Sequence, residues 1–141
     1  EAMRTKQTKK IYWAWVEGRV EQEEGILEDH IAHDDYRAKV VSVGHPEGKV
    51  ARLKYRVLER KGNCTLVEIE LETGRYHQIR LQFASRGHPI WGDTKYGARE
   101  IFAPHAIALH HKRLEILHPT TKQWMVFEAP LPPNWDRSSR T

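Results

Sequence analysis

Arg80 is the residue whose surroundings in this sequence most directly suggest chemistry. It lies in the stretch GRYHQIRLQFASRGHPIWGDTKYG, residues 74–97. At helical spacing Arg80 shares one face with Tyr76 and Phe83. A guanidinium that points toward an apolar face keeps its charge, so it needs a partner, most naturally a carboxylate in bidentate geometry. Such a pair is either a structural salt bridge or a means of orienting an active-site carboxylate.

The elements that position Arg80 can be predicted from local signals. We expect a helix from near Arg75 to Gly87, because Thr73 is a suitable cap and glycine favours the left-handed residue after a helix. The turn Lys61-Gly62-Asn63 joins two segments of alternating apolar residues and predicts a hairpin.

Most of the remaining chain is predicted to form strands. They are expected at residues 11–18, 51–60, 63–73, 109–119 and 123–132, the last two around the turn Pro119-Thr120-Thr121. Residues 19–50 are mostly polar, and we interpret them as a connecting excursion. The order strands, helix, strands indicates an α+β fold, with a mostly antiparallel mixed sheet and the helix packed on it.

Composition narrows the class of protein. The 141 residues suffice for one domain or part of one, and the net charge is +4. Residues 72–113 hold seven Arg or Lys against three Asp or Glu, so the whole excess lies there, as expected for a surface that binds RNA or DNA. Cys64 is the single cysteine, which excludes an internal disulfide. Without a signal-like start or a long apolar run, we expect a cytoplasmic protein with no membrane partner.

Several ordered motifs resemble the RluA-type family of RNA pseudouridine synthases. TGRYHQIR followed by GHPIWGDTKYG, residues 73–97, is similar to the family pattern TGRTHQIR…GHPIxGDxxYG. The segments at 10–18, 48–60, 109–114 and 127–132 resemble, in order, the family elements KxYxAxVxG, GKxAxTxYxVLER, LHAxxLxF and FxAPLP. Tyr76 departs from the pattern, where the family usually has threonine, and Trp91 replaces a smaller aliphatic residue.

The resemblance implies isomerisation of uridine to pseudouridine in ribosomal or transfer RNA, without metal or organic cofactor. In the family an aspartate in an HRLDxxTSG motif carries the covalent chemistry. The tyrosine matching Tyr12 stacks on the base and serves in proton removal, and the arginine matching Arg80 pairs with the aspartate. The family match and the basic charge together predict RNA-binding residues at Arg75, His77, Gln78, Arg86 and Leu109.

The aspartate motif does not occur in this sequence. In the family it precedes the KxYxAxVxG strand, which here begins at Lys10. We therefore expect residues 1–141 to be the C-terminal portion of a single synthase catalytic domain, inactive by itself. The alternative is a degenerate relative that only binds RNA.

Other interpretations of single residues stay open. Tyr12 and Leu109 could be packing residues, and His77 and Gln78 could satisfy backbone groups. Asp93 is expected to brace a turn rather than act as a base. The nine histidines invite a metal site, but His110 and His111 are adjacent on a strand and point to opposite faces, so we predict none.

Two non-enzymatic functions are also consistent with the composition. A plain RNA-binding module would explain the basic and aromatic residues, although no RNP, KH or zinc-knuckle signature is present. A protein-interaction domain would use surface tryptophans, for which the candidates are Trp13, Trp15, Trp124 and Trp135.

Overall fold

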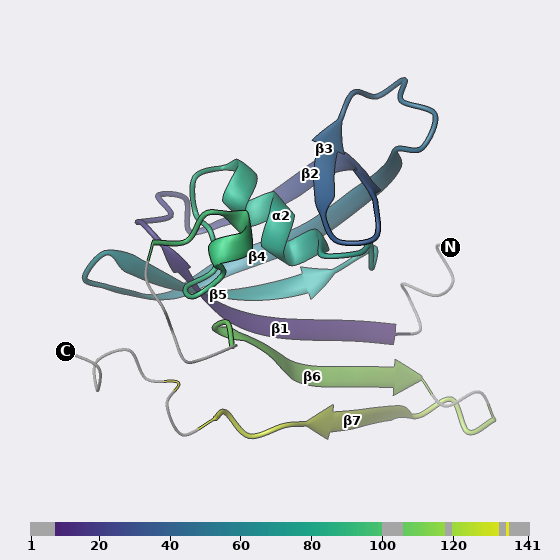
Figure 1. Ribbon diagram of the computed structural model, residues 1–141. Coiled ribbons are helices and arrows are strands. Elements are labelled where there is room, and N and C mark those ends of the chain that lie inside the picture. Colours follow the sequence, from purple (N-terminus) through teal and green to yellow (C-terminus); the bar gives the residue numbers. More distant parts are fainter. Residues whose placement is uncertain (1–7, 100–105, 118–119, 133–134, 136–141) are drawn as a thin grey trace.

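Seven strands form one antiparallel sheet in the computed structural model, which describes residues 8–99, 106–117, 120–132 and 135 (Figure 1). The strand order is β3-β2-β4-β5-β1-β6-β7. The elements are β1 (Thr8–Glu17), β2 (Glu24–His33), β3 (Ala38–Val41), β4 (Lys49–Lys61), β5 (Cys64–Leu71), α2 (Gln78–Ser85), the 3₁₀ helix η1 (Thr94–Tyr96), β6 (Leu109–Leu117) and β7 (Trp124–Glu128). This confirms the predicted α+β class.

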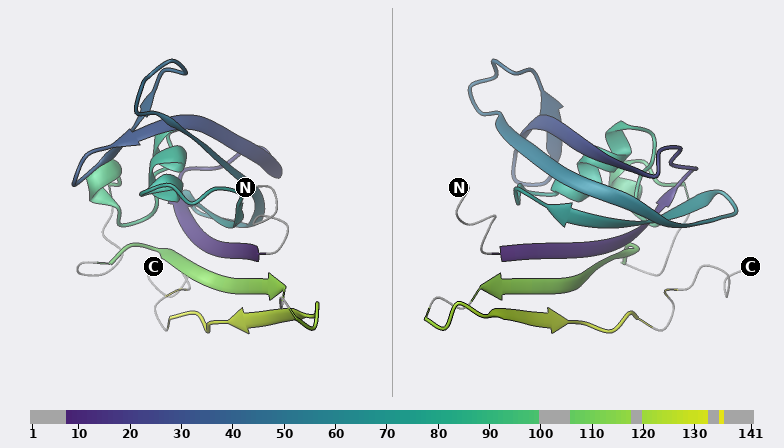
Figure 2. Two further views of the ribbon diagram at one scale, coloured as in Figure 1. Left: turned by 90° about the vertical axis from the view of Figure 1, so that its right-hand side faces the viewer. Right: turned by 180° about the vertical axis from the view of Figure 1, so that it is seen from behind.

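The helix packs on one face of the sheet, and the register shows which side chains share that face. Directly paired residues of antiparallel strands point to the same side. Tyr55 pairs with Ile69, which in turn pairs with Tyr12. The Tyr55 ring meets the Phe83 ring of α2 edge-on at 5.8 Å, so α2 lies on the side of these three residues. Figure 2 shows the twisted sheet curving around α2 and η1.

The β4–β5 hairpin forms as predicted, because its sequence suits buried central strands. Leu53, Val67 and Ile69 are fully buried on the helix side. The turn at Gly62 has a φ of 60°, which glycine adopts without strain. The predicted strands at both ends of the chain are also present as β1, β6 and β7. Pro119, placed in the predicted β6–β7 turn, lies outside the described residues.

Residues 19–50 are not the connecting excursion that their polarity indicated, because they contain β2 and β3. β2 pairs with β4 from Glu24 to Ile31, and its last four residues pair with β3. On the helix-covered face β2 carries Asp29 opposite Ala51, and its carboxylate binds Gln82 and Arg86 of the helix region. This acid interrupts the apolar alternation by which a strand is recognised in sequence.

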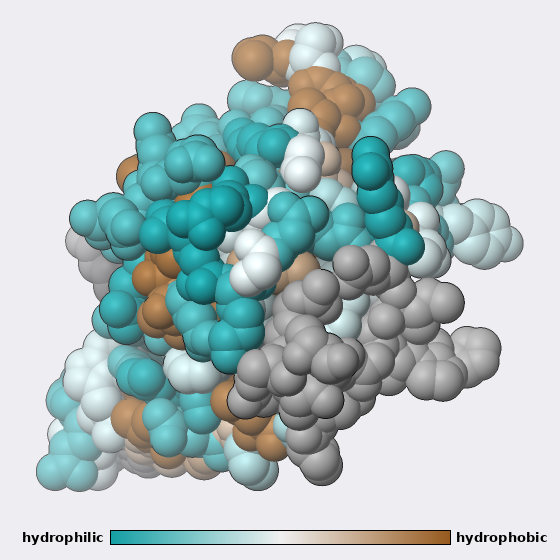
Figure 3. Space-filling model, turned by 90° about the vertical axis from the view of Figure 1, so that its left-hand side faces the viewer, coloured by the Kyte–Doolittle hydropathy of each residue, from teal (hydrophilic) through white to brown (hydrophobic). Residues whose placement is uncertain are grey.

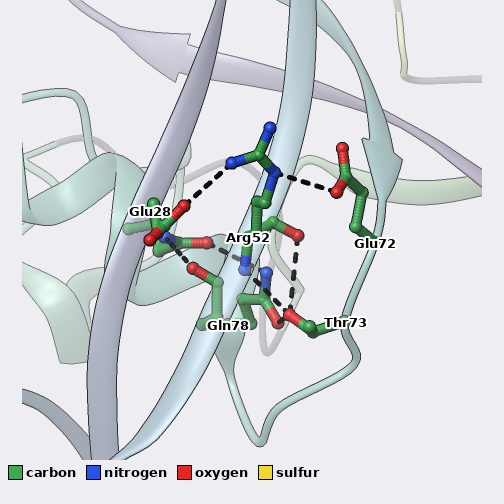
Figure 4. A network of polar contacts seen from close by, with 7 residues as sticks. Glu28, Arg52, Glu72, Thr73 and Gln78 are labelled. Carbon is green, nitrogen blue, oxygen red and sulfur yellow. Dashed lines mark hydrogen bonds and ion pairs between the residues drawn. The ribbon is translucent and has the colours of Figure 1, made fainter. Parts of the chain in front are cut away.

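The helix begins at Gln78, three residues later than predicted, and Thr73 is not its cap. Instead, the Thr73 hydroxyl accepts a hydrogen bond from the Arg52 N–H at 2.9 Å and donates to the Gln78 side-chain carbonyl at 2.8 Å (Figure 4). That carbonyl also accepts the Arg75 N–H. The N-cap is His77, in a left-handed conformation with φ 56°. The chain therefore makes a side-chain-braced turn before the helix starts.

Arg52 anchors this turn to the sheet. Its guanidinium bridges Glu28 of β2 and Glu72 beyond the end of β5, each at 2.9 Å (Figure 4). These exposed ion pairs contribute little energy individually. Their effect is to fix the end of β5, from which the turn leads into α2.

The helix ends as predicted. Gly87 has a φ of 86°, and the N–H groups of Gly87 and His88 bond the carbonyls of Ala84 and Phe83. This pair of bonds is a Schellman motif, which favours glycine at the left-handed position.

Replacing Gly87 with alanine should lower the free energy of unfolding by about 1 kcal/mol, because a Cβ disfavours this φ. Space is not the cause, since a Cβ at Gly87 would meet nothing within 4 Å. Gly44→Ala is the matched control: it is equally open but lacks a positive φ, so its stability should stay unchanged or rise slightly. Urea unfolding of both variants measures the difference, and equal stabilities would contradict the assignment.

Two of the four tryptophans considered as interaction residues are buried, which corrects that expectation. Trp15 is 1% exposed and Trp135 is 5% exposed, and the Trp15 indole donates to the Trp135 carbonyl. Trp13 is half-buried, whereas Trp124 on β7 is 50% exposed. The surface seen from the left-hand side of Figure 1 is mostly hydrophilic, with apolar residues in separate patches (Figure 3). Within the described ranges, no helix is long and apolar enough to cross a membrane.

Candidate active site

Arg80 is held in the bidentate carboxylate pair that its sequence context predicted, and its partner is Asp93. The Arg80 Nε and Nη2 atoms donate to the two Asp93 carboxylate oxygens at 2.8 and 2.9 Å. The Asp93 side chain is 1% exposed and that of Arg80 is 21% exposed. The hydrogen bonds to Asp93 raise the pKa of Arg80 further, so the guanidinium is charged at every physiological pH.

Asp93 is positioned by the irregular segment after the helix. Its N–H bonds the Ile90 carbonyl, and its own carbonyl accepts the N–H groups of Tyr96 and Ala98. Ile90 in turn forms an isolated bridge with Val16 of β1. Asp93 thus braces a turn, as expected, and its side chain in addition fixes the direction of Arg80.

Tyr96 and His77 complete the surroundings of the guanidinium. Arg80 and Arg37 both place their guanidinium carbons over the Tyr96 ring, at 5.1 and 4.7 Å from its centre. His77 contacts the Tyr96 hydroxyl through Nδ1 at 2.6 Å and the Arg80 Nη1 through Nε2 at 2.9 Å. Arginine can only donate, so Nε2 accepts and the proton lies on Nδ1. His77 is therefore neutral in this arrangement.

The pKa of His77 is accordingly lower than its ordinary value of 6.5, first because of burial and then because of the charges on Arg80 and Lys95. NMR titration should show His77 taking its proton below pH 6.5, whereas in the urea-unfolded chain it titrates near 6.5. Because the unfolded chain binds this proton first, the free energy of unfolding should decrease as the pH falls below 6.5. A folded His77 that titrates at or above 6.5 would contradict the assigned proton position.

Tyr12, the second predicted catalytic residue, lies near the middle of β1. Its ring stacks on the His111 ring of β6, with centres 4.4 Å apart and planes 11° from parallel. Burial raises the pKa of the Tyr12 hydroxyl above 10.0, so it is protonated at neutral pH. Burial also lowers the pKa of His111, which favours a neutral ring in the stack. One face of Tyr12 is thus covered by an aromatic partner.

Tyr12 and Arg80 lie on the same side of the sheet. The register places Tyr12 on the side of Ile69 and Tyr55, and α2, which carries Arg80, packs on that side. Among the described residues no direct contact joins Tyr12 to Arg80. The helix α2 packs on Tyr55 of β4, and β1, which carries Tyr12, lies two strands away from β4. The prediction that they share one cleft stays a prediction.

Three of the predicted RNA-binding residues gather at the start of α2. Arg75 and His77 are half-buried, and the Arg75 Nε donates to the Val50 carbonyl at 2.7 Å. Gln78 is only 3% exposed, and its amide bonds Thr73 and Arg75 within the turn. Gln78 therefore fixes the turn, while Arg75 and His77 are partly exposed at the surface.

The other two predicted RNA-binding residues lie elsewhere. Arg86 follows the C-terminal end of α2, about 12 Å along the helix from its start, and pairs with Asp29 at 2.6 Å. Leu109 is the first residue of β6 and packs against the core. The structure therefore does not bring the five residues into one group.

Sequence reasoning missed the pairing of Arg80 with Asp93, although a signal was available. Asp93 is the single acidic residue within residues 74–97. The stacking of His111 on Tyr12 had no comparable signal, because it depends on the β1–β6 register, which shifts at a bulge between Ile11 and Tyr12.

His110 and His111 of β6 lie in different surroundings. The predicted opposite orientation of His110 and His111 is confirmed: His111 stacks on Tyr12, while His110 contacts the Ala129 carbonyl and lies near Trp135. In the part of the chain that the structure describes, no group of three or more His, Cys, Asp or Glu side chains could hold a metal ion.

Comparisons with known proteins agree with the motifs. The family model of the RNA pseudouridylate synthases matches residues 1–85. Over 86% of its length the chain is 40% identical to the uncharacterized RNA pseudouridine synthase YlyB of Bacillus subtilis. It is 39% identical, over 88% of its length, to ribosomal large subunit pseudouridine synthase D of Nitrosomonas europaea. The chain spans 40% and 38% of these two relatives.

A solved structure supports the same assignment. Human RNA pseudouridylate synthase domain containing 1 superimposes with a TM-score of 0.76 at 25% identity, over 96% of this chain and 60% of that one. The TGRYHQIR motif forms the turn before α2 and the first residues of α2, and GHPIWGDTKYG runs from the end of α2 through η1, so the two motifs supply Arg80 and Asp93. The resemblance seen in the sequence is confirmed, and the chain belongs to the RNA pseudouridylate synthase family.

Proposed function

We propose that the protein carrying this chain converts uridine to pseudouridine in ribosomal or transfer RNA, in the cytoplasm. Residues 1–141 are then the C-terminal portion of its catalytic domain. The observation that carries the proposal is the buried Asp93 fixing Arg80 on the sheet face that also carries Tyr12. The name of the Nitrosomonas relative, a ribosomal large subunit enzyme, favours ribosomal RNA among the substrates.

Arg80 is suited to hold the nucleophilic aspartate that the family pattern supplies upstream. A guanidinium has five N–H donors. The contacts with Asp93 and His77 use three of them, which leaves capacity for a second carboxylate. Asp93 is then the anchor that sets the direction of Arg80, and the second acid is the group that reacts with the nucleotide.

Tyr12 is suited to act on the base. In the isomerisation the bond from the ribose to N1 of uracil breaks, the ribose is rejoined to C5, and the C5 proton leaves. A tyrosine with one face stacked on His111 offers its hydroxyl and its remaining surface to a base. Because its pKa is raised, the Tyr12 hydroxyl must pass its own proton on as it accepts one.

The target uridine has to leave its stack to reach such residues. The excess of basic residues within 72–113 provides positive charge that attracts the RNA phosphates. We propose that Arg75, His77, Arg86 and Leu109 contact RNA at different nucleotides, since they do not form one group, and that Gln78 acts by shaping the turn.

The test is tritium release from RNA labelled at C5 of uridine. The full-length protein should release tritium from transcribed ribosomal or transfer RNA. Residues 1–141 alone should release none, because no HRLD motif is present to supply the nucleophile. Turnover by the isolated chain would show that the nucleophile lies within these residues.

A second candidate, a non-catalytic RNA-binding module derived from the family, would use the same basic residues of 72–113. A full-length protein that binds RNA but releases no tritium from any tested RNA would support the module and exclude the synthase.

A further inference from the structure

A hollow of about 510 Å³ lies between β2, the loop before β4 and the turn that leads into α2. Its lining includes His33, Lys49, Arg75 and Tyr76. A second hollow of about 190 Å³ adjoins it and shares His33 with it. The larger volume falls within the range that holds small ligands. Neither Tyr12 nor Arg80 lines either hollow, although His77, which stacks on Tyr76, also contacts Arg80.

Three aromatic rings form an array at the wall of the larger hollow. Tyr76 stacks on His77, with ring centres 3.9 Å apart and planes 20° from parallel. The His33 ring lies 4.9 Å from the Tyr76 ring at a tilt of 38°. Tyr76 is nevertheless 40% exposed. An exposed aromatic ring supported by others offers a flat surface on which a further ring can stack.

The array is held in place by the fold. The left-handed backbone of His77 and its bonds to Tyr96 and Arg80 fix the ring that supports Tyr76. The His33 Nδ1–H donates to the Asp34 carbonyl at 2.9 Å, which orients the His33 ring beside Tyr76. A stacking surface that is already ordered loses little entropy when it binds.

The rims of the two hollows are mainly basic. They carry four cationic residues and two acidic ones, namely Lys49, Arg75, Arg37 and Lys39 against Glu47 and Asp34. The Asp34 carboxylate already caps the following turn by accepting the N–H groups of Tyr36 and Arg37. The surface therefore combines a stacking platform with positive charge, which is the composition of sites for single-stranded nucleic acid.

We propose that the Tyr76 array is a base-stacking subsite for an unpaired nucleotide of the RNA substrate, outside the uridine that reacts. This inference rests on the proposed function. Tyr76 occupies a position where the family pattern usually has threonine, so its ring distinguishes this chain from that pattern and would contribute to its preference among RNAs. The base stacks on the array, while Lys49 and Arg75 contact the flanking phosphates.

The test uses the full-length protein and a single-stranded RNA with 2-aminopurine at successive positions around the target uridine. In the parent protein one position should show quenched fluorescence, because the base stacks on the array. Tyr76→Ala should remove this quenching and weaken RNA binding by about 5- to 150-fold, the range for loss of one stacked base. Tyr76→Phe keeps the ring and should retain both quenching and affinity.

The salt dependence of RNA binding separates the contribution of base stacking from that of contacts to phosphate. Tyr76→Ala should leave the slope of log Kd against log salt unchanged, whereas Lys49→Ala should reduce it, since only the lysine releases counterions. Trp124→Ala is the matched control, because this ring is 50% exposed on β7, at the opposite edge of the sheet. Its removal should change neither the RNA affinity nor the salt slope. Circular dichroism of each variant shows that it is folded.

Failure of this subsite can be told from failure of the proposed function. A folded Tyr76→Ala protein that keeps parental affinity and quenching would overturn the subsite, even if the parent releases tritium. A parent that releases no tritium but depends on Tyr76 for binding would overturn the synthase and support the subsite.

Discussion

Arg80→Ala, made in the full-length protein, is expected to lose both stability and pseudouridine formation. Without the guanidinium, the 1% exposed Asp93 carboxylate has no cationic partner, and removing one member of a buried pair costs about 3–5 kcal/mol. We expect the lower end, about 3 kcal/mol, because the Arg80 side chain is 21% exposed. The turnover number should fall by at least about 100-fold, as for loss of one preorganised charged donor.

The stability loss can be separated from the loss of chemistry by removing both charges. Replacing a buried pair with apolar residues is often neutral for stability. The double variant Arg80→Leu/Asp93→Leu should therefore recover most of the unfolding free energy that Arg80→Ala loses. Urea unfolding of the parent and both variants measures this. A double variant as unstable as Arg80→Ala would show that the pair is not the source of the loss.

Tyr12→Phe should leave RNA binding intact while turnover falls by about 10²- to 10⁴-fold, the contribution of general acid–base catalysis. The variant keeps the ring that stacks on His111 and loses only the hydroxyl. The fold should persist because Tyr12 is half-buried and keeps its ring, and the RNA affinity should persist because that ring is unchanged. Single-turnover tritium release gives the rate, and fluorescence anisotropy gives the RNA affinity.

Tyr12→Leu is the companion variant, since it removes the ring as well. It should lose turnover and also weaken RNA binding if the ring stacks on the target base. If Tyr12→Phe turns over as fast as the parent, the hydroxyl takes no part in the reaction and Tyr12 is a packing residue of β1.

The parts of the fold that were predictable are those in which local signals and burial agree. β4 and β5 alternate apolar residues around a Gly62 turn, and Gly87 ends the helix as expected. β2 was missed because its inward Asp29 is satisfied by residues 53 and 57 positions later in the chain, a pairing that no local pattern contains. The helix start was placed too early because Thr73 bonds a side chain instead of the helix backbone.

In the candidate site, too, some features could be predicted from the sequence and others could not. That Arg80 needed a bidentate carboxylate followed from its charge and helical position alone. Asp93 was the single acidic residue of the motif and so a candidate partner, but its contact with Arg80 depends on how the segment after Gly87 folds back over α2. The stacking of Tyr12 on His111 depends on strand register across a bulge, and the array around Tyr76 depends on the position of β2.

The most direct test of the central claim is the amount of pseudouridine formed by a stability-matched Arg80 variant. Full-length parent and Arg80→Leu/Asp93→Leu proteins, both shown to be folded, are mixed in excess with 5-tritiated RNA, and tritium release is followed over a single turnover. If Arg80 holds the reacting carboxylate, the parent releases tritium and the folded double variant releases none above background. Release by the double variant within tenfold of the parent rate would show that Arg80 and Asp93 form only a structural salt bridge.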